Sequence, residues 1–332
     1  MRLPPPKKDL LPPGPPRWRG VLALSIVTAG YLAVLAYVDR DTRALERLTA
    51  LAGPLLVCSA LVLASFALRY QRWHGALQRQ GHPVGQWHGL RAYLAGFAFT
   101  ASPGKAGELL RIRYFAGMGV PSRTVLATFI HERGQDLLIL TLLGMSAAAL
   151  VPALGAVLGL VLTLLILLLL TSCSAWLQTR LLRLICLVPV TPFRRLASFL
   201  LDGLIAAGPL WRPAVALPGM AWGTIAWLLS ALAFATLCSA VGLQLAWHQA
   251  LGIYPIAMLA GAVSFVPGGV GTTEAAIALM LAATGASLDA ALAVAVGIRL
   301  TSLWLAVAVG MLAMTNLELQ TTRTPSLPSR LH

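Results

Sequence analysis

Ionisable side chains gather in one stretch of an otherwise apolar chain, from Ser102 to Met145. They are Lys105, Glu108, Arg111, Arg113, Arg123, His131, Glu132, Arg133 and Asp136. Ionisable groups beside or inside apolar segments are costly, and in membrane proteins they mark substrate, ion or proton sites. We therefore expect the chemistry of this protein to lie in this stretch.

The same pattern recurs near the C-terminus, at a constant offset of 166 positions. The aligned pairs are Glu108 with Glu274, Gly119 with Gly285, Ala127 with Ala293, Arg133 with Arg299, Gly144 with Gly310 and Met145 with Met311. The matched Glu and Arg carry the most weight, because charged residues make up only 11% of the chain. We predict an internal duplication, with repeat one at about 92–150 and repeat two at about 250–315.

Each copy opens on residues that interrupt a helix. We interpret as hinges Pro103, Gly104, Pro267, Gly268, Gly269 and Gly271. Proline lacks the backbone N–H that a helix needs, and glycine adopts conformations that other residues avoid. Paired apolar segments broken in this way point to the binding site of a transporter.

The composition predicts an all-α polytopic membrane protein. Of the 332 residues, 58% are hydrophobic, and several apolar runs reach the ~20 residues that a spanning helix needs. A membrane β-barrel would instead alternate polar and apolar residues in short segments. The net charge of +14 comes from basic residues beside these runs. This is typical of cytoplasmic loops rather than of nucleic-acid binding.

The apolar runs predict about six full transmembrane helices, over 21–38, 48–68, 120–150, 154–176, 214–241 and 290–314. A shorter helix at the interface, or a partial span, is expected over 196–211. Residues 20–316 then form a single transmembrane domain. A disordered, basic, Pro-rich tail (1–19) precedes it, and a second tail (317–332) follows. Loop charges place both tails in the cytoplasm.

Two further segments are expected to form re-entrant hairpins. Residues 92–102 are too few to cross a bilayer and meet Pro103-Gly104, and the chain returns through 107–117. The second hairpin has arms at 250–266 and 272–284. The helices after the two hairpins then run in opposite directions, so the repeats are inverted. If one hairpin crosses the membrane, the repeats are parallel instead.

Arg299 is the strongest candidate for a substrate ligand. It is the only Lys or Arg between Pro213 and Thr322, and it lies deep within an apolar helix. Its planar fork suits a phosphate or a carboxylate. The alternative is a structural partner for Glu274 or Asp289.

Glu108 and Glu274 each follow a Pro-Gly break, close to the start of a helix. Each carboxylate either caps its helix or pairs with Arg133 or Arg299 across the repeat interface.

The remaining candidates leave alternatives open. Lys105, Arg111 and Arg113 surround the first hairpin, as cytoplasmic surface charges or as an entry site for an anionic head group. Glu132 and Asp136 share a helical face. With His131 they form either a stabilising polar network or a proton relay. We expect no metal or cofactor, because neither the His nor the four Cys positions have ligand spacing.

At these residues the chain resembles a known family. The runs PGKAGELLRIRYF and HERGQDLL, and later PGGVGTTEAAIALMLAATG with Arg299 beyond it, are similar to the transmembrane domain of lysylphosphatidylglycerol synthase. That resemblance implies a flippase, which moves aminoacylated phosphatidylglycerol between leaflets. In two-domain members, a soluble C-terminal domain makes this lipid from aminoacyl-tRNA. We expect the flippase-like part alone here, without tRNA binding. Other members are associated with glycolipid, polyprenyl-linked or hopanoid pathways.

We therefore expect a flippase in a bacterial inner membrane, not an enzyme, whose substrate is a lipid with a phosphate head group. Arg133 and Arg299 would bind the phosphate, and Glu108 and Glu274 would hold these arginines or meet a cationic part of the head group. One alternative is an integral-membrane enzyme acting on a lipid phosphate or glycolipid, with His131, Glu132 and Asp136 as its acid/base set. Another is an accessory scaffold of a lipid-modifying complex.

Overall fold

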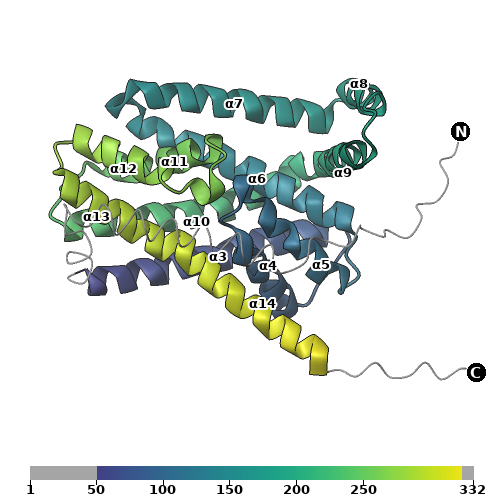
Figure 1. The fold of residues 1–332 in the computed structure, drawn as a ribbon, viewed down its shortest axis with the longest axis horizontal. Helices are drawn as coiled ribbons and strands as arrows, with labels where there is room; N and C mark the ends of the chain where they lie inside the picture. The colour runs from purple at the N-terminus through teal and green to yellow at the C-terminus, as the bar shows by residue number, and fades with distance from the viewer. Residues whose placement is uncertain (1–50, 324–332) are drawn as a thin grey trace, which may run out of the picture.

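The described part of the chain is entirely helical. A computed structural model describes residues 51–323, and within them helices and turns follow one another without a β-strand (Figure 1). This confirms the predicted all-α class. The expected first span at 21–38 and the tail at 1–19 lie outside the described residues, as does the end of the second tail.

The α-helices are α3 (Ala52–Arg79), α4 (Gln86–Ala95), α5 (Arg111–Ala116), α6 (Ser122–Gly144), α7 (Pro152–Cys173), α8 (Ala175–Cys186), α9 (Thr191–Ala207), α10 (Pro213–Ala240), α11 (Trp247–Val263), α12 (Thr272–Ala283), α13 (Leu288–Arg299) and α14 (Leu305–Arg323). The 3₁₀ segments between them are η1 (Gly96–Phe99), η2 (Pro103–Leu110), η3 (Met145–Leu150), η4 (Gly208–Trp211) and η5 (Pro267–Gly269). A π-helical turn, η6 (Leu300–Trp304), joins α13 to α14.

Within the described residues, four helical segments are long and apolar enough to cross a membrane: Ala52–Arg79, Pro152–Cys173, Pro213–Ala240 and Leu288–Gln320. The last of them is continuous through α13, η6 and most of α14. The four segments correspond to the spans predicted at 48–68, 154–176, 214–241 and 290–314. The fifth, expected over 120–150, forms α6 of 23 residues followed by η3, and α6 carries four charged side chains. The total of six therefore stays a prediction.

The surface of α7 explains why such helices need a lipid environment. Large apolar side chains are exposed along the second half of α7, at Leu160, Leu162, Leu164, Ile166, Leu167 and Leu170. In Figure 1, α7 lies along the outer edge of the helical body. Contiguous exposed apolar surface of this extent marks contact with a membrane or a partner, which accords with a membrane-embedded protein.

The chain between α7 and α10 differs from expectation. The short helix predicted at 196–211 begins earlier, as α9 at Thr191, and its last residues form η4. Sequence patterning also missed α8, which directly follows α7. Its N-cap is Ser174, whose side chain accepts a hydrogen bond from the N–H of Leu177.

Both Pro-Gly breaks are real interruptions of helical geometry. Gly104 and Lys105 have φ of 56° and 57°, and Gly268 has φ of 64°. The left-handed region is costly for a residue with a side chain, so Lys105 is held there by its surroundings. The two breaks also touch, since a Cβ built on Gly268 would lie 3.3 Å from the Cα of Ala101. Segments 164 positions apart therefore meet inside the helical body.

Each long helix that follows one break packs against the segment that precedes the other break, an arrangement we call exchanged packing. Helix α6 packs against α11, and α14 packs against α4 and η1 (Figure 1). Gly144 of α6 faces Ile256 of α11, where a Cβ would lie 3.2 Å from that of Ile256. The aligned Gly310 of α14 lies against the backbone of Phe97 and Ala98. Each long helix thus uses a glycine to approach the segment that precedes the other break.

Replacing Gly310 with Ala should separate α14 from η1, because the new Cβ would overlap backbone atoms that cannot rotate away. We expect a loss of about 1–3 kcal/mol in the free energy of unfolding, measured by thermal unfolding in detergent. Gly155→Ala in α7 is the control, since nothing lies within 4 Å of a Cβ there. Equal stability of the two variants would contradict the close packing of α14.

Candidate functional site

A network of charged side chains lies inside the helical body. Its members come from α3, η2, α5 and α6, and they are Arg69, Arg72, Glu108, Arg111, Glu132, Arg133 and Asp136. Six of the seven are at most 7% exposed. Isolated charges at such depth would be very unfavourable, and paired ones are tolerated only when their hydrogen bonds are met.

Glu132 stands at the centre of the network. Its carboxylate accepts a hydrogen bond from the hydroxyl of Tyr93 at 2.6 Å. It also contacts guanidinium nitrogens of Arg72 at 3.0 Å, Arg133 at 3.2 Å and Arg111 at 3.3 Å. One buried carboxylate therefore orients three arginines from three different helices.

Replacing Tyr93 with Phe should lower the free energy of unfolding by about 1.5–3 kcal/mol, as expected for a hydrogen bond to a charged group. Thermal unfolding in detergent measures the loss. Tyr70→Phe is the control, because Tyr70 is also buried but its hydroxyl meets the imidazole of His74, at 3.3 Å. That change should cost about 0.5–1.5 kcal/mol. Equal losses would argue against the central position of Glu132.

Asp136 lies one helical turn beyond Glu132 and faces the same arginines. It contacts Arg72 at 2.9 Å, Arg133 at 3.2 Å and Arg69 at 3.5 Å. The indole N–H of Trp227 donates to it at 3.0 Å. The i, i+4 spacing of the two carboxylates thus places them on one face, as the sequence indicated.

Arg111 corrects one expectation. The sequence predicts Arg111 to be a cytoplasmic surface charge or part of an entry site for a head group, but its side chain is fully buried. Its guanidinium lies 3.9 Å from the ring centroid of Tyr93, and it also pairs with Glu108 at 3.0 Å. Stacking on aromatic rings and a carboxylate partner together compensate for the lost hydration. Arg111 therefore links two carboxylates of the network, Glu108 and Glu132.

The equivalent pair in the C-terminal half is simpler. Arg299 Nε donates to Glu274 at 3.0 Å, Nη2 donates to the carbonyl of Gly268, and Nη1 lies 3.9 Å from the sulfur of Met258. Glu274 also accepts the N–H of Gly271 at 2.7 Å and so caps α12. Glu274 therefore both caps its helix and pairs with an arginine, although this arginine belongs to its own copy and not to the other one. A thioether is a weak acceptor, so Nη1 is the nitrogen left for a ligand.

Glu108 occupies the matching place in the first half. Its carboxylate accepts from the hydroxyl of Thr100 at 2.8 Å and lies 4.0 Å from Arg133. The sequence predicted pairs across the repeat interface, but Glu108 with Arg133 and Glu274 with Arg299 each join two residues of the same copy.

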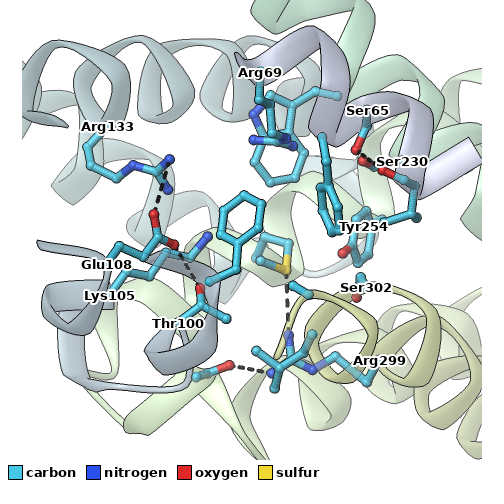
Figure 2. Close-up of a pocket in the computed structure, with 18 residues that line it drawn as sticks. Ser65, Arg69, Thr100, Lys105, Glu108, Arg133, Ser230, Tyr254, Arg299 and Ser302 are labelled. Carbon is cyan, nitrogen blue, oxygen red and sulfur yellow. Dashed lines mark hydrogen bonds and ion pairs between the residues drawn. The ribbon is translucent and has the colours of Figure 1, made fainter. Parts of the chain in front are cut away.

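A cavity of about 80 Å³ lies between these two pairs (Figure 2). Arg133 and Glu108 approach it from one side and Arg299 from the other, while Lys105 extends into its middle. The side-chain ammonium of Lys105 makes no hydrogen bond or ion pair with another residue of the described chain, whereas its backbone N–H donates to the carbonyl of Ser102 at 3.0 Å. One water needs about 10–15 Å³ of such space, so the cavity admits several waters or a small anionic group.

The predicted site residues therefore fall into three groups. Lining the cavity are Lys105, Glu108, Arg133, Arg299 and Gly268. Behind them, without lining it, lie Arg111, Glu132, Asp136 and Glu274. The side chain of Arg113 is half exposed and pairs with Glu318 at 3.2 Å, away from the cavity. His131 packs against Trp211 instead of joining the carboxylates, with ring centroids 4.7 Å apart.

Arg69 and Arg72 were not among the predicted site residues, because the predicted span ends at position 68 and basic residues beside a span usually belong to a cytoplasmic loop. The helix instead continues to Arg79. The signal was there, because positions 69, 72, 76 and 79 have the spacing of one helical face.

The fold and the site together define a polytopic helical membrane protein with a charged internal cavity. A family model described as the lysylphosphatidylglycerol synthase TM region matches residues 20–310. The chain therefore belongs to this family, which confirms the resemblance seen in its motifs. A search of curated proteins found no match.

Proposed function

We propose that this protein is a flippase, which moves a lipid with a phosphate head group between the leaflets of a bacterial inner membrane. The observation that carries the proposal is the cationic cavity at the meeting point of the two Pro-Gly breaks. In hydrocarbon, non-helical backbone is tolerated where it is buried in protein or lines a polar cavity, and transporters bind substrates at such places.

The charges around the cavity favour an anion. Among the residues that the structure describes, six cations line this cavity or lie directly behind its lining: Arg69, Arg72, Lys105, Arg111, Arg133 and Arg299. Four carboxylates oppose them: Glu108, Glu132, Asp136 and Glu274. The excess is two positive charges, and Lys105 is the cation without a described partner. An excess of this kind in a low-dielectric site is relieved by a bound anion, and Arg and Lys are the usual ligands of phosphate.

An inverted repeat would let the cavity open to either leaflet in turn. Its support is the exchanged packing of α6 on α11 and of α14 on α4 and η1. The short arms give further support. Helix α4 has 10 residues and α12 has 12, hence lengths of about 15 and 18 Å against a hydrocarbon core of about 30 Å. We propose that both hairpins are re-entrant and that one repeat rocks against the other.

Both termini are proposed to face the cytoplasm. The pairing of Arg113 with Glu318 places the return of the first hairpin beside the C-terminal end of α14. Basic residues beside membrane spans usually face the cytoplasm, so Arg113 and the end of α14 would both lie on that side.

The enzyme alternative has less support. Two of its three candidate acid/base residues, Glu132 and Asp136, each contact three arginines, and the third, His131, packs against Trp211. Carboxylates held so firmly in their charged form are poor general acids or bases.

The proposal is tested by leaflet exchange in proteoliposomes. Fluorescent phosphatidylglycerol, lysyl-phosphatidylglycerol and a polyprenyl phosphate would be compared with diacylglycerol, which has no phosphate, and with protein-free liposomes. We expect at least one phosphate lipid to exchange faster with the protein. Equal rates with and without protein for all three would reject the flippase and favour the enzyme or scaffold alternatives.

A further inference from the structure

A second cavity lies between α3, α6 and α10. Its volume is about 70 Å³, and its lining includes Arg72, Gly75, Arg79, His131 and Trp222. No acidic residue is among the described residues that line it. This cavity was not foreseen from the sequence, and its polar lining is cationic or neutral.

Buried donors without partners point to a ligand in this cavity. Arg72 is 3% exposed and His131 2%. Within the described chain, Nε and Nη1 of Arg72 and Nδ1 of His131 find no hydrogen-bond partner. Buried polar atoms are normally satisfied, so unpartnered donors beside a cavity indicate a missing acceptor.

Arg72 connects this cavity with the central one. Its Nη2 contacts Glu132 and Asp136 in the central network, while its Nε and Nη1 stay without a partner and the residue also lines the second cavity. One guanidinium therefore serves both places, and a negative group bound in the second cavity would lie next to the first.

One face of α3 runs past both cavities. Positions 62, 65 and 69 line the central cavity, and positions 72, 76 and 79 line the second one. Arg79 is exposed at the end of α3, whereas Arg69 is buried ten residues earlier. At 1.5 Å per residue, the arginines of this face cover about 15 Å, from the surface to the central site.

We infer that the second cavity is a separate binding site for the phosphate of a lipid, reached from the end of α3 that carries Arg79. Arg72, Arg79 and His131 hold the phosphate there before it passes Arg72 into the central cavity. Binding of a phosphate in the second cavity is inferred from the unpartnered donors. Its place on the route of the lipid to the central cavity rests on the proposed function.

Gly75 offers a way to fill this cavity alone. It lines the second cavity and not the central one, and nothing lies within 4 Å of a Cβ built on it. Gly75→Leu should therefore occupy the space without disturbing its neighbours. Gly159→Leu in α7 is the matched control, because Gly159 is also a helical glycine with open space around it.

Lipid retention is measured by native mass spectrometry of the full chain in detergent, with dioctanoyl phosphatidic acid as the probe. We expect two retained lipids for the wild type and for Gly159→Leu, and at most one for Gly75→Leu, because the second cavity is then filled and also lies on the route to the central one. Dioctanoylglycerol, which lacks the phosphate, should not be retained at either site. Two retained lipids in Gly75→Leu would overturn the inference.

Two further arms make the result decisive. Arg79→Gln changes an exposed residue, whose guanidinium donates a hydrogen bond to the carbonyl of Ala214 at 2.8 Å. The fold should survive the loss of this exposed bond, and the affinity for the second lipid should fall by roughly tenfold or more. Unchanged affinity would contradict the inference. Retention of inorganic phosphate, but of no lipid, in the second cavity would reject it as well. Because retention is read in detergent, these outcomes are independent of whether the protein moves lipids between leaflets.

Discussion

Replacing Arg299 with Met should abolish leaflet exchange and also destabilise the protein. The variant removes the nitrogen that faces the cavity, and it leaves the carboxylate of Glu274 buried without its cation. Breaking one half of a buried pair costs about 3–5 kcal/mol. Thermal unfolding in detergent and leaflet exchange in liposomes measure the two effects separately.

A double variant separates binding from folding. Adding Glu274→Gln to Arg299→Met removes the orphaned charge, while the amide oxygen of Gln still accepts the N–H of Gly271 and caps α12. We expect most of the stability to return and exchange to stay absent. Exchange at the wild-type rate in the double variant would mean that Arg299 only neutralises Glu274.

The second large effect is expected at Lys105, where charge can be removed at little structural cost. Lys105→Asn should weaken binding of a phosphate lipid by about 10–100-fold, the equivalent of losing a hydrogen bond from a charged donor. Stability should not fall, because no described carboxylate loses a partner and Asn tolerates the positive φ of 57°. Titration with short-chain phosphatidic acid and thermal unfolding provide the two readouts.

Arg113→Gln is the matched control for Lys105. It removes a cation from the same part of the chain, but one that is half exposed and pairs with Glu318 outside the cavity. An exposed pair is worth little, so both affinity and stability should stay near the wild type. If the two variants lose affinity equally, the cavity is not the binding site and the effect is one of general surface charge.

The network itself argues for function rather than stability. Replacing buried ion pairs with apolar side chains is often neutral or stabilising, and seven such charges lie between α3, η2, α5 and α6. A chain selected only to fold would have little reason to keep them. A site that accepts an anionic group within the membrane does need them, because water is not there to solvate its charge.

Much of the fold follows from the sequence. Apolar run length predicts α7, α10, α11 and α12 to within a few residues, because hydrophobicity and helix-breaking residues dominate in these segments. The pairing of Glu274 with Arg299 also follows, since a lone charge deep in an apolar helix needs a partner nearby.

The rest of the site depends on contacts that no local pattern encodes. Arg69 and Arg72 follow an apolar run, where basic residues usually mark the membrane surface. Their burial comes from α6, whose carboxylates lie some 60 positions further along the chain. The burial of Arg111 similarly depends on Tyr93 and Glu132, which reach it from other helices. Only the packing of α3, α4 and α6 brings these groups together.

The decisive measurement is the exchange rate of a fluorescent phosphate lipid in liposomes that contain either wild-type protein or the Arg299→Met/Glu274→Gln double variant. The central claim is that the lipid phosphate passes through the cavity between Arg133 and Arg299. It predicts rapid exchange with the wild type, and with the equally inserted double variant only the rate of protein-free liposomes. Equal rates for the two proteins would contradict it.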